Sequence, residues 1–139
     1  MQVCEGEGWR LEHDPARHPF AVLIGGGPPE SAWAAEMTIE EAEALSSAVS
    51  RLLEQHASLA SSLMEEEAIS LELETLCAEG MLWVGLEGDR RRWSLRFLLS
   101  PSPAVRAFEG GWDRVASAAI AAALATLPLE SLPPRPDSR

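Results

Sequence analysis

The strongest pattern along this chain is helical. Between residues 38 and 67, where no Gly or Pro occurs, residues of one stripe recur at alternating steps of four and three. They are Leu45, Val49, Leu52, His56, Leu59 and Leu63. Thr38 and Glu41 have the spacing of a capping box, in which each side chain accepts a hydrogen bond from the other residue's backbone N–H. The stripe predicts one long helix. Because negative charge is unfavourable at a helix C-terminus, we expect it to end before the last residue of Glu65-Glu66-Glu67.

Beyond this helix, apolar and polar residues alternate, as they do in strands with one buried face. The alternation covers residues 69–74, 82–86 and 93–99. Between the last two segments, "EGDRRR" predicts a hairpin loop with Gly88 and Asp89 at its turn. "VRAFEGG" then predicts a short fourth strand, and the Ala-rich "WDRVASAAIAAALATL" predicts a second helix.

The first part of the chain gives weaker signals. "WRLEHDP" predicts a short strand that Pro15 ends, "FAVLIGGG" predicts a buried strand, and the region around Trp33 predicts a third. We expect Trp9 to hold the first of these strands against the core. "GGGPP", residues 25–29, lacks the Lys and the Ser or Thr of a phosphate-binding loop, so we expect a turn that ends a strand.

Strands, a long helix, four strands and a helix in this order predict an α+β fold. We expect antiparallel sheets with a long central helix and a C-terminal helix, arranged as β-sheet plus helix, twice. No residue-level repeat accompanies this doubling. Residues 1–127 are expected to form a single α+β domain. Residues 128–139, "PLESLPPRPDSR", are Pro-rich and polar, and we expect them to be a disordered tail.

Composition narrows the class of protein. The chain has 139 residues, 46% of them hydrophobic, which suits one globular domain rather than a disordered chain. No apolar run approaches the roughly 20 residues that span a bilayer, and the N-terminus lacks the basic and apolar regions of a signal peptide. We therefore expect a cytoplasmic protein without a membrane partner. Cys4 and Cys77 have no metal-binding spacing and are expected to be thiols.

Few residues suggest catalysis or metal binding. His13, Asp14 and His18 could ligate zinc, but no further ligand follows at a familiar spacing, and a surface loop is the plainer interpretation. His56 lies on the helical stripe, either as a buried general base or as a core residue whose ring nitrogens find partners. The sequence pairs no nucleophile with it. We therefore expect no enzymatic activity, no metal site and no cofactor.

One basic cluster stands out in a chain of net charge −11, in which every basic residue is Arg and Lys is absent. It surrounds the predicted hairpin and comprises Arg90, Arg91, Arg92, Arg96, Trp83 and Trp93. Arg beside aromatic residues on a sheet is typical of proteins that bind single-stranded nucleic acid. The alternative is a solubilising turn with the tryptophans in the core, and the negative net charge disfavours nucleic acid.

An acidic group follows the long helix. It comprises Glu65, Glu66, Glu67, Glu72 and Glu74. Charge runs are commonly no more than solvated surface, but an acidic strand face can also receive a basic or strand-adding protein partner. The leading prediction is therefore a binding or regulatory domain for an unidentified protein partner, and single-stranded nucleic-acid binding is the alternative. A homodimer is compatible with apolar surface left on the two helices.

Four blocks resemble a small cyanobacterial family, the domain of unknown function 1818. They are "GEGWRLEHDP", "WAAEMTIEEAEAL", "LMEEEAISLELE" and "LWVGLEGDRRRWSLRFLL". The resemblance implies a fold similar to that of the whirly-type single-stranded-DNA-binding transcriptional regulators, a cyanobacterial origin and a cytoplasmic location, but no activity. The plant whirly proteins bind DNA through a lysine-bearing strand motif. This chain has no Lys, so none of their binding residues is carried over.

Overall fold

The first part of the chain forms an antiparallel sheet of four short strands. The computed structural model describes residues 1–77, 80–100 and 107–127, so the predicted tail lies outside the described residues. In spatial order the strands are β1 (Gln2–Gly6), β2 (Trp9–His13), β3 (Val22–Gly26) and β4 (Trp33–Met37). Three of them were expected. The sequence analysis missed β1, which has only two apolar residues, Val3 and Cys4, and forms by pairing with β2.

The predicted long helix is α1 (Ile39–Ala60). Its capping box is confirmed, because Glu41 N donates to Thr38 Oγ1 at 3.1 Å and Thr38 N donates to Glu41 Oε1 at 3.0 Å. The helix ends earlier than the stripe suggested. His56 is its last buried residue and Leu59 is 44% exposed, so beyond His56 the helix has little core left to pack against.

The second antiparallel sheet follows α1 and contains four strands, three predicted by the alternation and the fourth by "VRAFEGG". They are β5 (Ile69–Cys77), β6 (Gly80–Gly88), β7 (Trp93–Ser100) and β8 (Phe108–Trp112), in this spatial order. The second helix is α2 (Arg114–Leu124). Trp112, expected within that helix, is the last residue of β8. The helix begins after Asp113, whose side chain accepts hydrogen bonds from Val115 N and Ala116 N.

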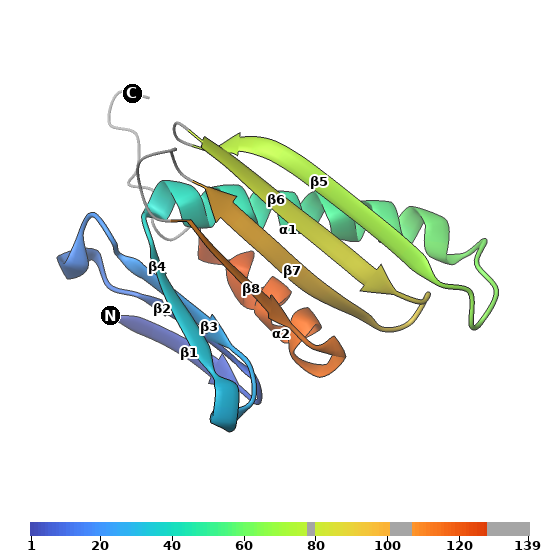
Figure 1. Ribbon diagram of the computed structural model, residues 1–139, viewed down its shortest axis with the longest axis horizontal. Helices are drawn as coiled ribbons and strands as arrows, with labels where there is room; N and C mark the ends of the chain where they lie inside the picture. Colours follow the sequence, from blue (N-terminus) through green and yellow to red (C-terminus); the bar gives the residue numbers. More distant parts are fainter. Residues whose placement is uncertain (78–79, 101–106, 128–139) are drawn as a thin grey trace.

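Both helices lie on the same side of the second sheet (Figure 1). Helix α1 packs against β5 and β6, and α2 packs against β7 and against β2 of the first sheet. The α+β class with a long and a C-terminal helix is therefore confirmed. The core fills the space between helices and sheets, and its largest fully buried side chains include Phe97, Ile24, Met37 and Leu45.

Two tryptophans join the sheets. The indole N–H of Trp112 on β8 donates to Gly25 O on β3 at 3.0 Å, and that of Trp33 on β4 donates to Gly111 O on β8 at 3.2 Å. The two rings lie 5.4 Å apart between centroids. Because each indole reaches the backbone of the other sheet, the orientation of the two sheets is fixed by directional bonds as well as by burial.

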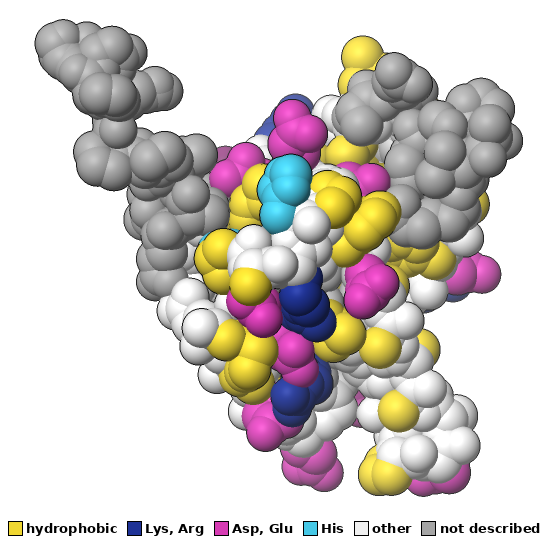
Figure 2. All heavy atoms as spheres, turned by 90° about the vertical axis from the view of Figure 1, so that its left-hand side faces the viewer, with side chains coloured by type: hydrophobic (Ala, Val, Ile, Leu, Met, Phe, Trp, Pro, Cys, Tyr) yellow, Lys and Arg dark blue, Asp and Glu magenta, His cyan; other side chains and the backbone are white. Residues whose placement is uncertain are grey.

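Ion pairs engage the two arginines on and beside the first sheet. Arg10 forms ion pairs with Glu5 and Glu12, and Arg17 Nη2 lies 3.4 Å from Glu12 Oε1. On the side where this sheet lies, Figure 2 shows Arg side chains alternating with acidic ones. Both arginines of residues 1–37 are thus engaged by carboxylates, and because this part of the chain holds six acidic residues, it stays acidic.

Candidate binding face on the second sheet

Among the residues that the structure describes, no helix covers one face of the second sheet, and we call it the outer face. In Figure 1 this face points towards the reader, with both helices behind it. Strand alternation and register place on it Ser70, Glu72, Glu74, Leu76, Met81, Trp83, Gly85, Glu87, Ser94, Arg96, Leu98 and Glu109. The neighbouring positions, such as Leu82, Val84 and Phe97, are buried against the helices.

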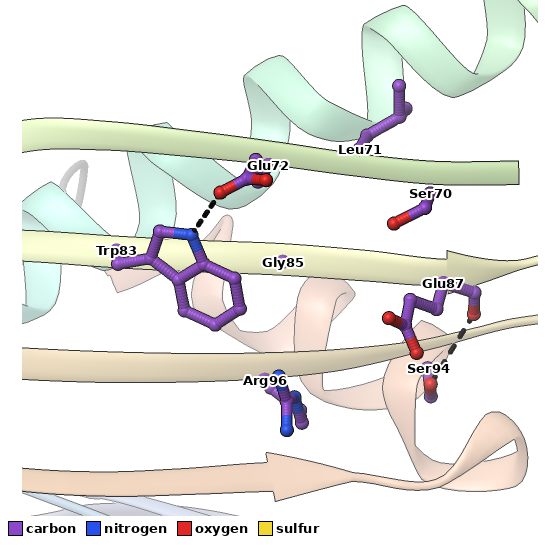
Figure 3. Close-up of a pocket in the computed structure, with 8 residues that line it drawn as sticks. All are labelled: Ser70, Leu71, Glu72, Trp83, Gly85, Glu87, Ser94 and Arg96. Carbon is purple, nitrogen blue, oxygen red and sulfur yellow. Dashed lines mark hydrogen bonds between the residues drawn. The ribbon is translucent and has the colours of Figure 1, made fainter.

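Trp83 is the centre of the outer face. Its indole ring lies over β6 towards Gly85 (Figure 3), and a Cβ atom at residue 85 would come within 2.5 Å of Trp83 Cη2. The indole N–H donates to Glu72 Oε1 on β5 at 2.7 Å. Arg96 on β7 places its guanidinium carbon 5.5 Å from the ring centroid. The ring is thus held flat on the sheet by contacts with three strands.

A shallow pocket adjoins this ring. It has a volume of about 250 Å³, and its polar lining comes from Ser70, Glu72, Glu87, Ser94 and Arg96. Figure 3 shows Glu72 and Arg96 on either side of the indole, with Ser70, Glu87 and Ser94 further along the strands. Carboxylates, hydroxyls and an aromatic face suit the recognition of a cation. The pocket lining includes no His or Cys that could serve as a base or nucleophile.

Apolar side chains continue the outer face away from the pocket. Leu76 is 78% exposed, Leu98 is 42% exposed and Met81 is 36% exposed. The register pairs Leu76 with Met81 and Trp83 with Leu98, so these four residues occupy adjacent rows of the sheet. Grouped exposed apolar side chains mark interaction surfaces more often than scattered ones do.

Carboxylates lie on both sides of Trp83 and Leu98. One row of the sheet reads Glu74, Trp83, Leu98 and Glu109 across all four strands. Glu72 and Glu87 add two further carboxylates, against the single cation Arg96 among the outer-face residues defined above. The outer face therefore combines exposed apolar side chains, which run from Trp83 and Leu98 to the Leu76–Met81 end of the sheet, with carboxylates on either side, in a chain of net charge −11.

The predicted Arg cluster is largely engaged by acidic and backbone groups. Arg91 Nη2 lies 3.3 Å and Arg90 Nη2 lies 3.9 Å from Glu65 carboxylate oxygens. Arg90 Nη1 also donates to Leu63 O at 3.5 Å. Arg92 contributes its backbone to the turn, since Asp89 N donates to Arg92 O at 2.9 Å. The hairpin loop itself is where the sequence predicted it.

The structure places Trp83 and Trp93 on opposite faces of the sheet. Trp93 lies on the inner face of the sheet, where its ring meets that of His56 at 6.2 Å between centroids. The reason is the alternation of the strands: Trp93 is in phase with buried Leu95, whereas Trp83 is out of phase with buried Leu82. Of the predicted nucleic-acid residues, the structure brings together only Trp83 and Arg96 on the outer face.

The predicted acidic group also divides. Glu72 and Glu74 are exposed on the outer face of β5. Glu65, Glu66 and Glu67 lie in the loop before that strand, where Glu65 pairs with the arginines and Glu67 Oε1 accepts from Met64 N. Of the apolar and acidic outer-face residues, the sequence analysis missed Leu76, Met81, Glu87, Leu98 and Glu109. They can be recognised in the sequence because they alternate with the buried residues along their strands.

His56 is a core residue. Its side chain is buried and its Nε2 lies 2.8 Å from Asp89 O, an acceptor, so Nε2 is the donor. This bond ties α1 to the β6–β7 hairpin.

The structure also places the potential metal ligands and the two cysteines. Within the part of the chain that the structure describes, no group of three or more His, Cys, Asp or Glu residues is placed to hold a metal ion. Asp14 instead accepts a hydrogen bond from Ala16 N. Cys4 and Cys77 are free thiols, and burial raises the pKa of Cys77. In the same residues, no helix is long and apolar enough to cross a membrane.

Comparison with known proteins places the chain in a family. A crystal structure of a protein of unknown function, described as belonging to the DUF155 family, from Prochlorococcus sp. NATL2A is similar with a TM-score of 0.79 and 34% sequence identity. The similarity covers 89% of this chain and 96% of that one. No curated protein matches. The likeness to whirly-type regulators stays a prediction. Because the model of the domain of unknown function DUF1818 matches residues 4–127, the chain belongs to the DUF1818 family.

Proposed function

We propose that this protein is a non-enzymatic binding domain whose outer face holds a basic, partly apolar segment of a protein partner. The observation that carries the proposal is the indole of Trp83, held flat on an open sheet face between carboxylates and exposed apolar side chains. The proposal keeps the protein–protein interaction that the sequence predicts, and it names a surface for it.

The exposed apolar side chains of the outer face would supply most of the affinity. Leu76, Met81 and Leu98 expose side chains that lose contact with water when a partner covers them, and such burial yields about 25 cal/mol per Å² before the costs of association. Trp83 adds a rigid aromatic surface, a residue type enriched at binding hot spots. The methylene stems of Lys and Arg side chains, like aliphatic side chains, can cover these apolar residues.

The carboxylates define the charge of the partner. Glu72, Glu74, Glu87 and Glu109 on the outer face favour Lys or Arg side chains, which can also lie against the face of the Trp83 ring. The net charge of −11 attracts a basic partner at long range and speeds its encounter with the surface. An acidic partner would meet repulsion.

The test is direct binding of a fluorescein-labelled peptide of eight residues in which Lys and Val alternate, followed by fluorescence anisotropy. We expect the double variant Glu72→Gln/Glu74→Gln and the variant Trp83→Ala each to weaken binding by about tenfold. The matched control is Glu30→Gln/Glu54→Gln, which removes two exposed charges away from the outer face and should change binding by about twofold at most. Absence of binding at low salt, or equal losses in both double variants, would overturn the proposal.

Single-stranded nucleic acid is the second candidate, and one observation favours it. The guanidinium of Arg96 lies beside the partly buried ring of Trp83, which is the pairing that binders of this class use for phosphate and base. Against it stand the acidic margin and the ion pairs of Arg90 and Arg91 with Glu65. Binding of a labelled oligothymidine that falls steeply with salt and disappears in Arg96→Ala would favour this candidate over the peptide.

A further inference from the structure

Strand β5 ends the second sheet with an open edge. It pairs with β6 in one continuous register, from Ile69 opposite Gly88 to Cys77 opposite Gly80. Among the described residues, no strand pairs with its other side. Figure 1 shows this edge running along the margin of the molecule, with α1 behind the sheet. Alternate N–H and C=O groups of the strand therefore point away from β6.

This edge lacks several devices that usually protect sheet edges. Ile69–Cys77 contains no Pro, no Lys and no bulge. Its inward-facing Ile69, Leu71 and Leu73 are only partly buried, whereas the inward-facing residues Leu82, Val84 and Leu86 of β6 are buried. One additional strand beside β5 would cover the apolar side chains that α1 leaves partly open.

The charges of β5 decide which strand fits. In an antiparallel pair of two copies of β5, residues that share a face stand opposite each other. Registers centred on Glu72, Leu73 or Glu74 each place at least one of these glutamates directly opposite a glutamate of the second copy. Because like charges opposite each other destabilise a sheet, self-pairing is disfavoured. A strand with basic residues at those positions would be stabilised instead.

We propose that the β5 edge takes up an extended segment of the partner protein as a further antiparallel strand of the second sheet. Lys or Arg residues at every second position of this segment lie on the outer face beside Glu72 and Glu74. The residues between them are aliphatic and pack beside Leu71 and Leu73. This inference rests on the proposed function and gives it a binding mode, β-strand addition.

Backbone methylation of the peptide tests this mode. In a strand, the N–H groups of alternate residues point to the same edge. Two analogues of the Lys-Val peptide are needed, one with N-methyl groups on the four Lys residues and one with them on the four Val residues. We expect one analogue to lose binding by about tenfold or more, because its methyl groups face β5, and the other to bind within about threefold of the parent peptide.

A peptide of the same composition with Lys and Val in blocks of two is the sequence control, and it should bind more weakly than the alternating peptide. Hydrogen exchange supplies a second measurement, in which the peptide slows exchange of β5 amides and leaves those of β1 unchanged. Equal binding of the two methylated analogues, or equal loss in both, overturns strand addition while the outer-face proposal stands. Failure of the parent peptide to bind overturns both proposals.

Discussion

The indole N–H of Trp83 on β6 and a carboxylate oxygen of Glu72 on β5 are joined by a hydrogen bond of 2.7 Å across the outer face. The bond directs the ring along the sheet rather than out into water. Gly85 leaves the space beneath it and Arg96 lies at its other side. A half-buried surface tryptophan that is fixed in this way loses little side-chain entropy when a partner covers it, which favours binding.

Gly85→Ala should remove this arrangement without unfolding the protein. The added Cβ would come within 2.5 Å of Trp83 Cη2, so the ring must leave the sheet. Because the ring is on the surface, we expect a loss of no more than about 1 kcal/mol in the free energy of unfolding and several-fold weaker peptide binding. Urea denaturation and anisotropy measure the two effects. In Gly88→Ala the new Cβ would lie 2.1 Å from Arg92 O, a backbone atom, so this control should lose more stability than Gly85→Ala.

How far the sequence predicts this fold depends on how regular each pattern is. Strands β5, β6 and β7 follow from strict alternation, and α1 follows from its stripe and its capping box, because these patterns record which side chains face the core. Strand β1 has no such pattern, since it is held by pairing with β2. Trp112 looked helical because Ala-rich sequence follows it, whereas its indole bond to Gly25 belongs to the joint between the sheets.

The candidate site was harder to predict than the fold. Closeness in sequence suggested that Trp83, Trp93 and the three arginines act together, but strand phase separates the tryptophans and Glu65 engages Arg90 and Arg91. When the same alternation is applied to every strand, it places Leu76, Leu98 and Glu109 on the outer face. What alternation alone cannot give is the cross-strand register, which brings Trp83 between Glu74 and Leu98.

Two buried serines should differ in their contribution to stability. Ser117 donates to Trp112 O at 3.0 Å and accepts from Leu95 N at 3.0 Å, so it joins α2 to β7 and β8. Ser46 makes one bond, to Leu124 O at 2.9 Å. We expect Ser117→Ala to lower the free energy of unfolding by about 2 kcal/mol, and Ser46→Ala by about half as much. Urea denaturation of both variants checks the order, and an equal or reversed loss contradicts it.

Trp112→Phe should show how much the contact between the two sheets contributes to the free energy of unfolding. Phe keeps an aromatic ring near Phe97, whose ring stacks on Trp112 at 5.6 Å, but it removes the N–H that satisfies Gly25 O. A buried carbonyl without its partner costs about 1–3 kcal/mol, and the smaller ring adds to the loss. Trp33→Phe, at a partly buried position with a longer bond of 3.2 Å, should cost less. Thermal or urea unfolding of the two variants measures the difference.

Asp89 organises the hairpin between β6 and β7. Its Oδ1 accepts hydrogen bonds from Arg92 N at 2.9 Å and Arg91 N at 2.8 Å, and its Oδ2 lies 3.7 Å from Arg114 Nη1. These contacts favour the charged carboxylate. The backbone bonds from Arg92 and Arg91, followed by the charge of Arg114, lower the pKa of Asp89 below its ordinary value of 3.8.

Asp89→Asn should therefore change how stability depends on pH. A carboxyl whose pKa is lower in the folded than in the unfolded protein stabilises the fold above its unfolded pKa, and this contribution is lost as pH falls through the folded pKa. We expect the wild type to be more stable than Asp89→Asn at about pH 6, and the gap to narrow as pH falls from about 4 towards 2. Urea midpoints of both proteins across this range measure the gap. A gap that stays constant would mean that Asp89 acts through the shape of its side chain alone, since Asn keeps one acceptor oxygen but carries no charge.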